Sequence, residues 1–580
     1  MAALLVAATG LASCGAPPTT GATAERRAPD LISRAERTGW VHTGNHAEAV
    51  RMCRDFAAAY PGRARCDGFG TTPEGRAMVA LVVGAPDARR PVVLVQAGIH
   101  AGEIEGKDAG FWLLRDLLDG RAAPGALDAV TVVFVPILNP DGHERTGPGN
   151  RPNQRGPAEM GFRTNAQNLN INRDYMKVDT PEIAAVLQLW RRWDPVVYID
   201  LHTTDGAKFE HDVAVLVSPR APRDRLQQAA RALSDGLQAR LTQLGHLPLP
   251  FYPSFVKQDD PASGFDDYEP PPRFSQGYAA ARGRIGVLVE THSWHTYKQR
   301  GLATYHVLQA LLERAVRDAA GWREVARATD AAGADLAGKG VPLAWGPGGA
   351  PRTIEFRGYH YQRRRSEVSG GTWITYDEKR PQVWRVPLRD ESVPAVTATA
   401  PRAGYLVTAG FAGVVARRLD SHDIQYRRLS RELNVDAEVF RATRAESQPS
   451  FEGRARVTLS GSWTRERRRV PPGALWIPIA QPRARLVMYL LEPQAPDSLA
   501  TWGFFNASLE QKEYMEPYVA EEVAREMLKD REVRAAFDKA LEDPAFAASP
   551  ERRLDFFYRR HASWDEGKDL LPVLRLDAPP

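Results

Sequence analysis

Four residues of the kinds that bind a metal ion, or act beside one, stand where apolar segments end. His100 and Glu103 follow one apolar segment, His202 follows a second, and Glu290 closes a third. A catalytic zinc is commonly held by three protein ligands, often two histidines and one glutamate, with a fourth position left for water. Each residue alone is more often structural, so the prediction of a metal site depends on the four together.

The elements that would position these residues are strands of a sheet that alternate with helices. We expect strands at 78–83, 91–97, 130–137, 196–201, 213–217 and 285–290, and helices at about 46–59, 103–119, 181–193, 221–243 and 302–318. Continuous Val, Leu and Ile strands with helices between them predict a buried, largely parallel sheet of the α/β class, covered by helices on both faces.

Further motifs follow in a fixed order along residues 38–318. They are Phe69-Gly70-Thr71-Thr72-Pro73-Glu74-Gly75-Arg76, His100-Ala101-Gly102-Glu103, Asn139-Pro140-Asp141-Gly142, Asn172-Arg173, His202 and Glu290. Together they resemble the M14 zinc carboxypeptidase family, in a bacterial lipoprotein-type form. The resemblance implies a mixed, mostly parallel eight-stranded sheet with helices on both faces, and one Zn²⁺ per chain.

The resemblance also implies roles for single residues. His100, Glu103 and His202 are similar to the zinc ligands, and Glu290 to the general base that takes a proton from the zinc-bound water. The remaining expected roles are oxyanion stabilisation by Arg163 and binding of the substrate's terminal carboxylate by Asn172 and Arg173. A planar guanidinium suits that second task because it can meet a carboxylate in two parallel hydrogen bonds.

The chain departs from the family at the residues around the ligands. Asn170 stands where the family often has an aspartate that orients the first zinc histidine, and an uncharged amide predicts that His100 is a weaker ligand. Asp200 could supply the missing charge or be a core-edge residue bound by backbone donors. For the substrate-contacting tyrosine, Tyr268 is preferred to Tyr278. We expect four further histidines to be surface or supporting residues: His143, His211, His292 and His295.

Composition narrows the class of protein. The 76 basic and 71 acidic residues give a net charge of 76 − 71 = +5, a weak field for 580 residues. The arginine runs 363–365 and 467–469 lie in β patterning without interleaved aromatics, so we expect exposed strand or loop faces and no nucleic-acid partner. No Gly-x-Ser-x-Gly elbow or phosphate-binding loop is present.

The amino-terminal residues and the three cysteines bear on location. Leu11-Ala12-Ser13-Cys14 resembles a lipobox, although the positive residues that usually precede one are absent. It predicts an exported periplasmic or outer-membrane lipoprotein, attached to the membrane through lipidated Cys14. Cys53 and Cys66 remain, either as a disulfide in an oxidising compartment or as two buried thiols.

The chain divides by composition into five parts. We expect a signal peptide at 1–14, a tether at 15–30, the peptidase domain at 31–330, a Gly/Pro-rich linker at 331–351, and a β-rich C-terminal domain of unknown role at 352–580. Within the last part, short strands such as 371–376 and 483–491 are expected to precede a charged helical stretch at 507–546.

These observations predict a zinc metallopeptidase that acts at the C-terminus of a peptide or peptide-like substrate with a free carboxylate. One alternative keeps the metal and changes the substrate to acyl-amino acids or murein peptides. Another is a catalytically silent cell-envelope binding protein. The complete set of His100, Glu103, His202 and Glu290 argues against the silent form.

Overall fold

The computed structural model describes residues 30–84, 90–221 and 223–580. The predicted signal peptide, the lipid-attachment site at Cys14 and the predicted tether up to residue 29 lie outside these residues. In the described part, no helix is long and apolar enough to cross a membrane.

An eight-stranded mixed sheet forms the centre of the N-terminal half. Its strand order is β1-β2-β4-β3-β5-β9-β6-β7. The central strands β4, β3, β5 and β9 are parallel, whereas β2 is antiparallel to β4 and β6 is antiparallel to β9. The bounds are β1 Ala64–Thr71, β2 Ala77–Val83, β3 Val92–Ala97, β4 Thr131–Val135, β5 Val197–Thr203, β6 Val213–Ser218, β7 Pro248–Leu249 and β9 Ile285–Thr291.

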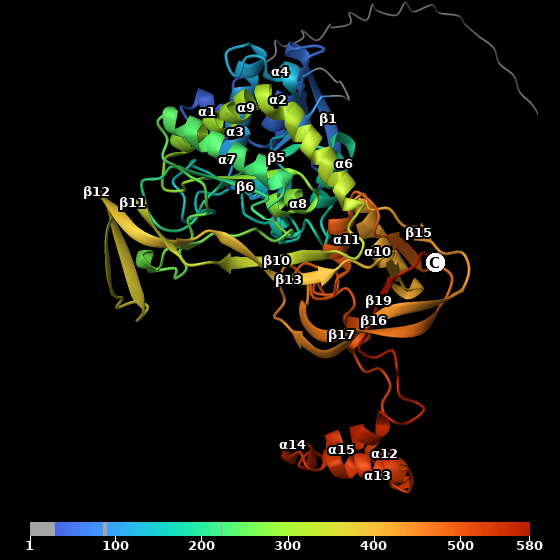
Figure 1. Cartoon of the computed structure of the whole chain (residues 1–580). Helices are drawn as coiled ribbons and strands as arrows, with labels where there is room; N and C mark the ends of the chain where they lie inside the picture. The colour runs from blue at the N-terminus through green and yellow to red at the C-terminus, as the bar shows by residue number, and fades with distance from the viewer. Residues whose placement is uncertain (1–29, 85–89, 222) are drawn as a thin grey trace, which may run out of the picture.

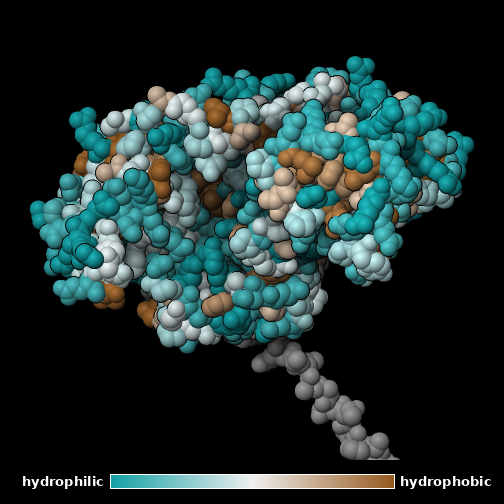
Figure 2. Space-filling view, turned by 90° about the horizontal axis from the view of Figure 1, so that it is seen from below, coloured by the Kyte–Doolittle hydropathy of each residue, from teal (hydrophilic) through white to brown (hydrophobic). Residues whose placement is uncertain are grey.

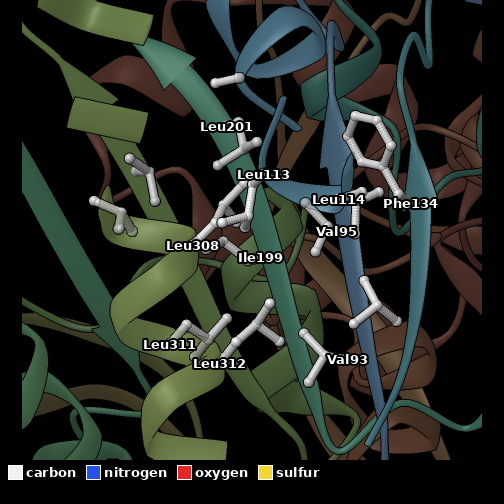
Figure 3. Packing of buried hydrophobic residues seen from close by; sticks show 14 of the residues in the cluster. Val93, Val95, Leu113, Leu114, Phe134, Ile199, Leu201, Leu308, Leu311 and Leu312 are labelled. Carbon is white, nitrogen blue, oxygen red and sulfur yellow. The ribbon is translucent and has the colours of Figure 1, made fainter. Parts of the chain in front are cut away.

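Helices cover both faces of this sheet, as predicted (Figure 1). Successive residues of a strand face opposite sides, so Val93 and Val95 of β3 pack into one core while Val92 and Leu94 pack into the other. Figure 3 shows the first core, where Leu113 and Leu308 meet these strands. The first face carries α2 His46–Ala59, α3 Glu105–Leu118, α7 Arg225–Gln243 and α9 Tyr297–Gly333; the second carries α6 Pro181–Trp193 and α8 Ser275–Ala281.

Short elements connect these helices and strands. They are α1 Arg34–Arg37, α4 Ala126–Ala129, α5 Pro140–Glu144 and the 3₁₀ turns η1 Ile171–Arg173 and η2 Pro261–Ser263. A disulfide joins Cys53 of α2 to Cys66 of β1, which resolves the choice between a bridge and two free thiols.

The segment predicted as a linker is instead structured. Helix α9 runs past its predicted end to Gly333, and β10 (Gly340–Gly348) pairs antiparallel with β13 (Glu391–Thr399). The prediction failed because Gly and Pro were read as breakers. Pro342 and Pro347 are tolerated here because both strands of a two-stranded ribbon are edge strands.

The region after β10 is β-rich and holds two further sheets. In one, the hairpin of β11 (Arg352–Arg365) and β12 (Thr372–Arg389) pairs with β8 (Phe265–Asp266) of the N-terminal half. The other has the order β15-β18-β14-β19-β16-β17. Its bounds are β14 Gly404–Val407, β15 Arg427–Arg428, β16 Leu433–Ser447, β17 Val457–Val470, β18 Leu475–Pro478 and β19 Leu570–Leu576.

Two helices of this region pack against the second core: α10 (Ala409–Ser421) and α11 (Ala484–Leu491). The predicted strand at 483–491 is therefore wrong. A short, continuously apolar run fits a buried helix as well as a buried strand, and its Ala, Leu and Met residues favour the helix.

A small helical module projects from the β-rich region (Figure 1). It consists of α12 Pro517–Met527, α13 Arg531–Ala540, α14 Pro544–Ala547 and α15 Pro550–Tyr558, and follows the turn η3 Asn506–Leu509. The charged helical stretch predicted at 507–546 lies here. The face in Figure 2 is mostly hydrophilic, with apolar side chains in small groups. The arginine runs 363–365 and 467–469 lie on β11 and β17 and are largely exposed, as predicted.

Candidate metal centre and active site

Three neighbouring strands bring the predicted site residues to one edge of the sheet. His100 and Glu103 lie in the turn after β3, and His202 lies near the end of β5, the parallel neighbour of β3. Glu290 lies on β9 directly opposite His202 in the register. Since neighbouring residues in register point to the same face of a sheet, Glu290 is placed beside the histidine.

His100, Glu103 and His202 form a compact buried trio, with potential ligand atoms all within 4.8 Å of one another. Nε2 of His100 donates to Oδ1 of Asn170 at 3.0 Å, and Nε2 of His202 donates to Oδ2 of Asp200 at 2.8 Å. The Nδ1 atoms of His100 and His202 both face Oε2 of Glu103, at 3.2 and 3.0 Å.

This donor set fits a divalent cation. A neutral imidazole whose Nε2 carries the proton presents a lone pair at Nδ1, so two nitrogen lone pairs and one carboxylate converge. Burial lowers the pKa of His202, but Asp200 and Glu103 outweigh it and raise the pKa well above its usual value. Without a cation, a proton would hold this position. Zinc, which prefers such N and O ligands, would displace that proton.

Two arginines approach Glu103 from the other side. Nη2 of Arg151 lies 2.9 Å and Nη1 of Arg163 lies 3.0 Å from Oε1 of Glu103. Burial alone would raise the pKa of the Glu103 carboxyl, but His100, Arg151 and His202 outweigh it and keep that pKa well below its usual value. Sequence reasoning missed the buried Arg151, which stands in a polar loop without any motif around it.

A cavity of about 360 Å³ opens beside the trio. Its lining includes His100, His202 and the predicted Arg163, Asn172, Arg173, Tyr268 and Glu290. Oε2 of Glu290 is buried and has no hydrogen-bond partner among the described residues. Burial raises the pKa of Glu290, with Glu103 adding to the rise and His202 opposing it.

The other end of the cavity attracts anions. The Arg173 guanidinium lies over the ring of Phe274 at 4.4 Å, and its Nη1 donates to the carbonyl of Asn172 at 2.8 Å. Burial, with Arg163 and Arg273 nearby, lowers the pKa of Arg173 to about 10. The group therefore keeps its charge at neutral pH.

The structure separates the two candidate tyrosines. Tyr268 lines the cavity and is 40% exposed, whereas Tyr278 is fully buried in the second core and donates to Nδ1 of His422 at 3.0 Å. Tyr252, which the sequence did not single out, also lines the cavity. None of the four further histidines does; they are His143, His211, His292 and His295.

Residues 49–246 match the model of the zinc carboxypeptidase family, peptidase M14. Carboxypeptidase B of Astacus astacus is 25% identical over 137 residues, which are 23% of this chain and 45% of that protein. The chain thus matches less than half the length of that relative.

Solved structures are similar at lower identity. A metallo-carboxypeptidase from Burkholderia cenocepacia is 20% identical with a TM-score of 0.34, over 45% of this chain and 67% of that one. Carboxypeptidase A from Helicoverpa armigera is 15% identical with a TM-score of 0.36, over 48% and 74%.

The fold and the site define a mixed α/β protein with a buried His–Glu–His trio beside a cavity. The residues matched by the family model include all three members of the trio. The segment that carries the trio is thus similar to the zinc carboxypeptidases of family M14.

Proposed function

We propose that the protein is a zinc-dependent peptidase that removes the C-terminal residue of a peptide. The observation that carries the proposal is the convergence, at one cavity, of a metal-binding trio, an unpartnered buried carboxylate and a half-buried arginine. A free C-terminal carboxylate is the substrate group that suits Arg173.

His100, Glu103 and His202 would hold one zinc per chain. Zinc bound there would lower the pKa of a bound water towards about 7. Glu290 would accept the proton of the attacking water and hand it to the leaving amine. Its unpartnered Oε2 faces no competing donor among the described residues.

The arginines and Asn172 would orient the substrate. Arg173 and Asn172 would bind the terminal carboxylate, and the Asn172 side chain is held by the hydrogen bond from the Ser275 amide to its Oδ1 at 3.0 Å. Arg163, one-third exposed at the cavity, would donate to the oxyanion that forms at the scissile carbonyl. Losing one such donor typically costs about 10²–10³ in rate.

Glu290→Gln tests the proposal. The variant keeps the shape of the side chain but cannot accept the proton, so we expect peptide hydrolysis to be lost while zinc remains bound at one equivalent. Mass spectrometry of a digested peptide library and elemental analysis measure the two. Glu355→Gln, at an exposed position on β11, is the matched control. Undiminished release of C-terminal residues by Glu290→Gln would contradict the proposal.

We also propose that the protein is exported. The Cys53–Cys66 disulfide supports this, because disulfides persist in oxidising compartments. Fractionation of cells producing the wild-type chain and Cys14→Ala tests export and lipid attachment separately.

A further inference from the structure

A tight turn of the C-terminal region reaches the loop beside the metal trio. It is the two-residue hairpin turn Phe451–Arg454, closed by backbone hydrogen bonds of 3.0 and 3.1 Å between its end residues. Glu452 and Gly453 occupy its centre with φ of +50° and +73°. This turn type requires positive φ at both central positions, where Asn, Asp or Gly is usual. A glutamate there is therefore a conformational outlier, of the kind that is often retained for function.

The Glu452 side chain contacts the loop beside the metal trio. Its Oε2 accepts a hydrogen bond from the backbone amide of Asn170 at 2.8 Å, across 282 positions of the sequence. A hydrogen bond to an ionised carboxylate is stronger than a neutral one. Glu452 thus fixes the backbone at Asn170 from outside the peptidase domain.

The Asn170 side chain contacts both a predicted metal ligand and the turn that carries the predicted substrate-binding residues. Its Oδ1 accepts from Nε2 of His100 at 3.0 Å and from the backbone amide of Asn172 at 3.1 Å. The first contact orients a predicted metal ligand. The second shapes the turn that carries Asn172 and Arg173.

Docking of the two regions does not depend on Glu452. Asp179 of the peptidase domain pairs with Arg454 and with Arg418, at 2.5 and 2.9 Å, and Arg273 pairs with Asp497 at 3.0 Å. These contacts hold the turn in place and leave the Glu452 carboxylate free for a local role.

We propose that Glu452 is a positioning residue of the active site, which holds Asn170 so that His100 faces the metal and Arg173 faces the substrate. The part of this inference that concerns Arg173 and the substrate rests on the proposed function. The part that concerns His100 depends only on the metal-binding trio. The C-terminal region thereby completes the site that the peptidase domain carries.

Two measurements on the full-length protein test the proposal. Hydrogen–deuterium exchange of peptides spanning residues 165–176 reports the Asn170 amide, and competition with a chromophoric chelator gives the zinc dissociation constant. The variants are Glu452→Ala and Glu452→Gln, which keeps an acceptor oxygen. Glu446→Ala is the matched control, because Glu446 lies on the same hairpin and pairs with the exposed Arg444.

We expect Glu452→Ala to speed exchange in 165–176 and to raise the zinc dissociation constant by about 3- to 10-fold, at or below the range for residues that directly support a ligand. Glu452→Gln should lie nearer the wild type, and Glu446→Ala should match it. With peptides, KM should rise more than kcat falls. If Glu452→Ala does not fold, Glu452→Gln is read in the same assays against Glu446→Ala.

Exchange and zinc affinity equal to those of Glu446→Ala would overturn the proposal. If the wild type binds zinc but cleaves no peptide, the proposed function fails, while exchange and affinity still decide the role of Glu452. A wild type that binds no zinc overturns both.

Discussion

The two histidines of the metal trio have unequal partners. His202 donates to the buried carboxylate of Asp200, whereas His100 donates to the neutral amide of Asn170. A charged acceptor makes the imidazole a stronger ligand, so His202 is the stronger anchor. The sequence predicts the Asn170 contact through the resemblance, but leaves Asp200 open. Alternation along β5 places Asp200 and His202 on one face, and only side-chain rotamers decide that Asp200 meets the histidine.

The substitution Asp200→Asn should weaken zinc binding. The amide is the same size and can still accept from Nε2 of His202, but it removes the charge. We expect the zinc dissociation constant to rise by about 10- to 100-fold, measured by chelator competition. Asp128→Asn, at an exposed position of α4, should leave it unchanged. Equal affinities of the two variants would show that Asp200 is only a core-edge residue.

At the scale of elements, local signals explain what the sequence could predict. Helices at 46–59 and 181–193 were predicted with the observed bounds, because each is apolar on one face and starts at a capping residue, Asn45 or Thr180. The central strands are apolar on both faces and were also found. β1 (Ala64–Thr71) was missed because its glycines and charges resemble a loop; only pairing with β2 makes it a strand.

Contacts between distant elements carry no local signal. His422 ends α10, yet its Nε2 donates to the carbonyl of Met176 at 3.1 Å and its Nδ1 accepts from Tyr278. The packing of α10 against the peptidase domain thus encloses an imidazole completely. Burial, opposed by the Met176 contact and aided by Arg282, lowers the pKa of His422 to about 3.

This burial predicts a pH-dependent stability. In the unfolded chain a histidine titrates near pH ~6.5, so between that pH and about 3 the unfolded state binds the extra proton and unfolding is favoured as pH falls. The contribution of His422 is intact above the unfolded pKa and declines by about 1.4 kcal/mol per pH unit below it. In urea unfolding, His422→Asn should be less stable than the wild type at pH 7.5. That gap should close towards pH 5; a constant gap would contradict the prediction.

At the scale of the whole molecule, the β-rich region and the peptidase domain share their cores. One core contains Tyr175 and Trp190 from the first part and Leu475 and Leu486 from the second. Another joins the cavity-lining Leu216 and Leu288 to side chains of the β11–β12 hairpin, Phe356 and Trp384. The sequence predicted two separate domains because its composition and hydrophobic pattern change between the two regions. Composition does not show that side chains of both regions are buried in the same cores.

The helical module is built differently. Its core is a separate small cluster around Ala524, Phe537 and Phe557. The chain enters and leaves it at one point, since the amide of Asp569 donates to the carbonyl of Ser508 at 2.8 Å. The module is therefore an insertion that closes on itself.

These two arrangements predict opposite effects of deletion. Replacing 510–567 by a short Gly/Ser linker should leave the melting temperature, zinc content and peptide hydrolysis close to those of the wild type, because the ends already meet.

A chain that stops at Lys339 should not fold, although it keeps the trio and Glu290. Exposing a large buried apolar side chain costs about 1.5–3 kcal/mol, so uncovering six would cost about 9–18 kcal/mol, as much as the roughly 5–15 kcal/mol that stabilises a typical domain. Circular dichroism, thermal melting and zinc analysis of both deletions measure this. A folded, zinc-binding chain ending at Lys339 would show that the β-rich region is a separable domain.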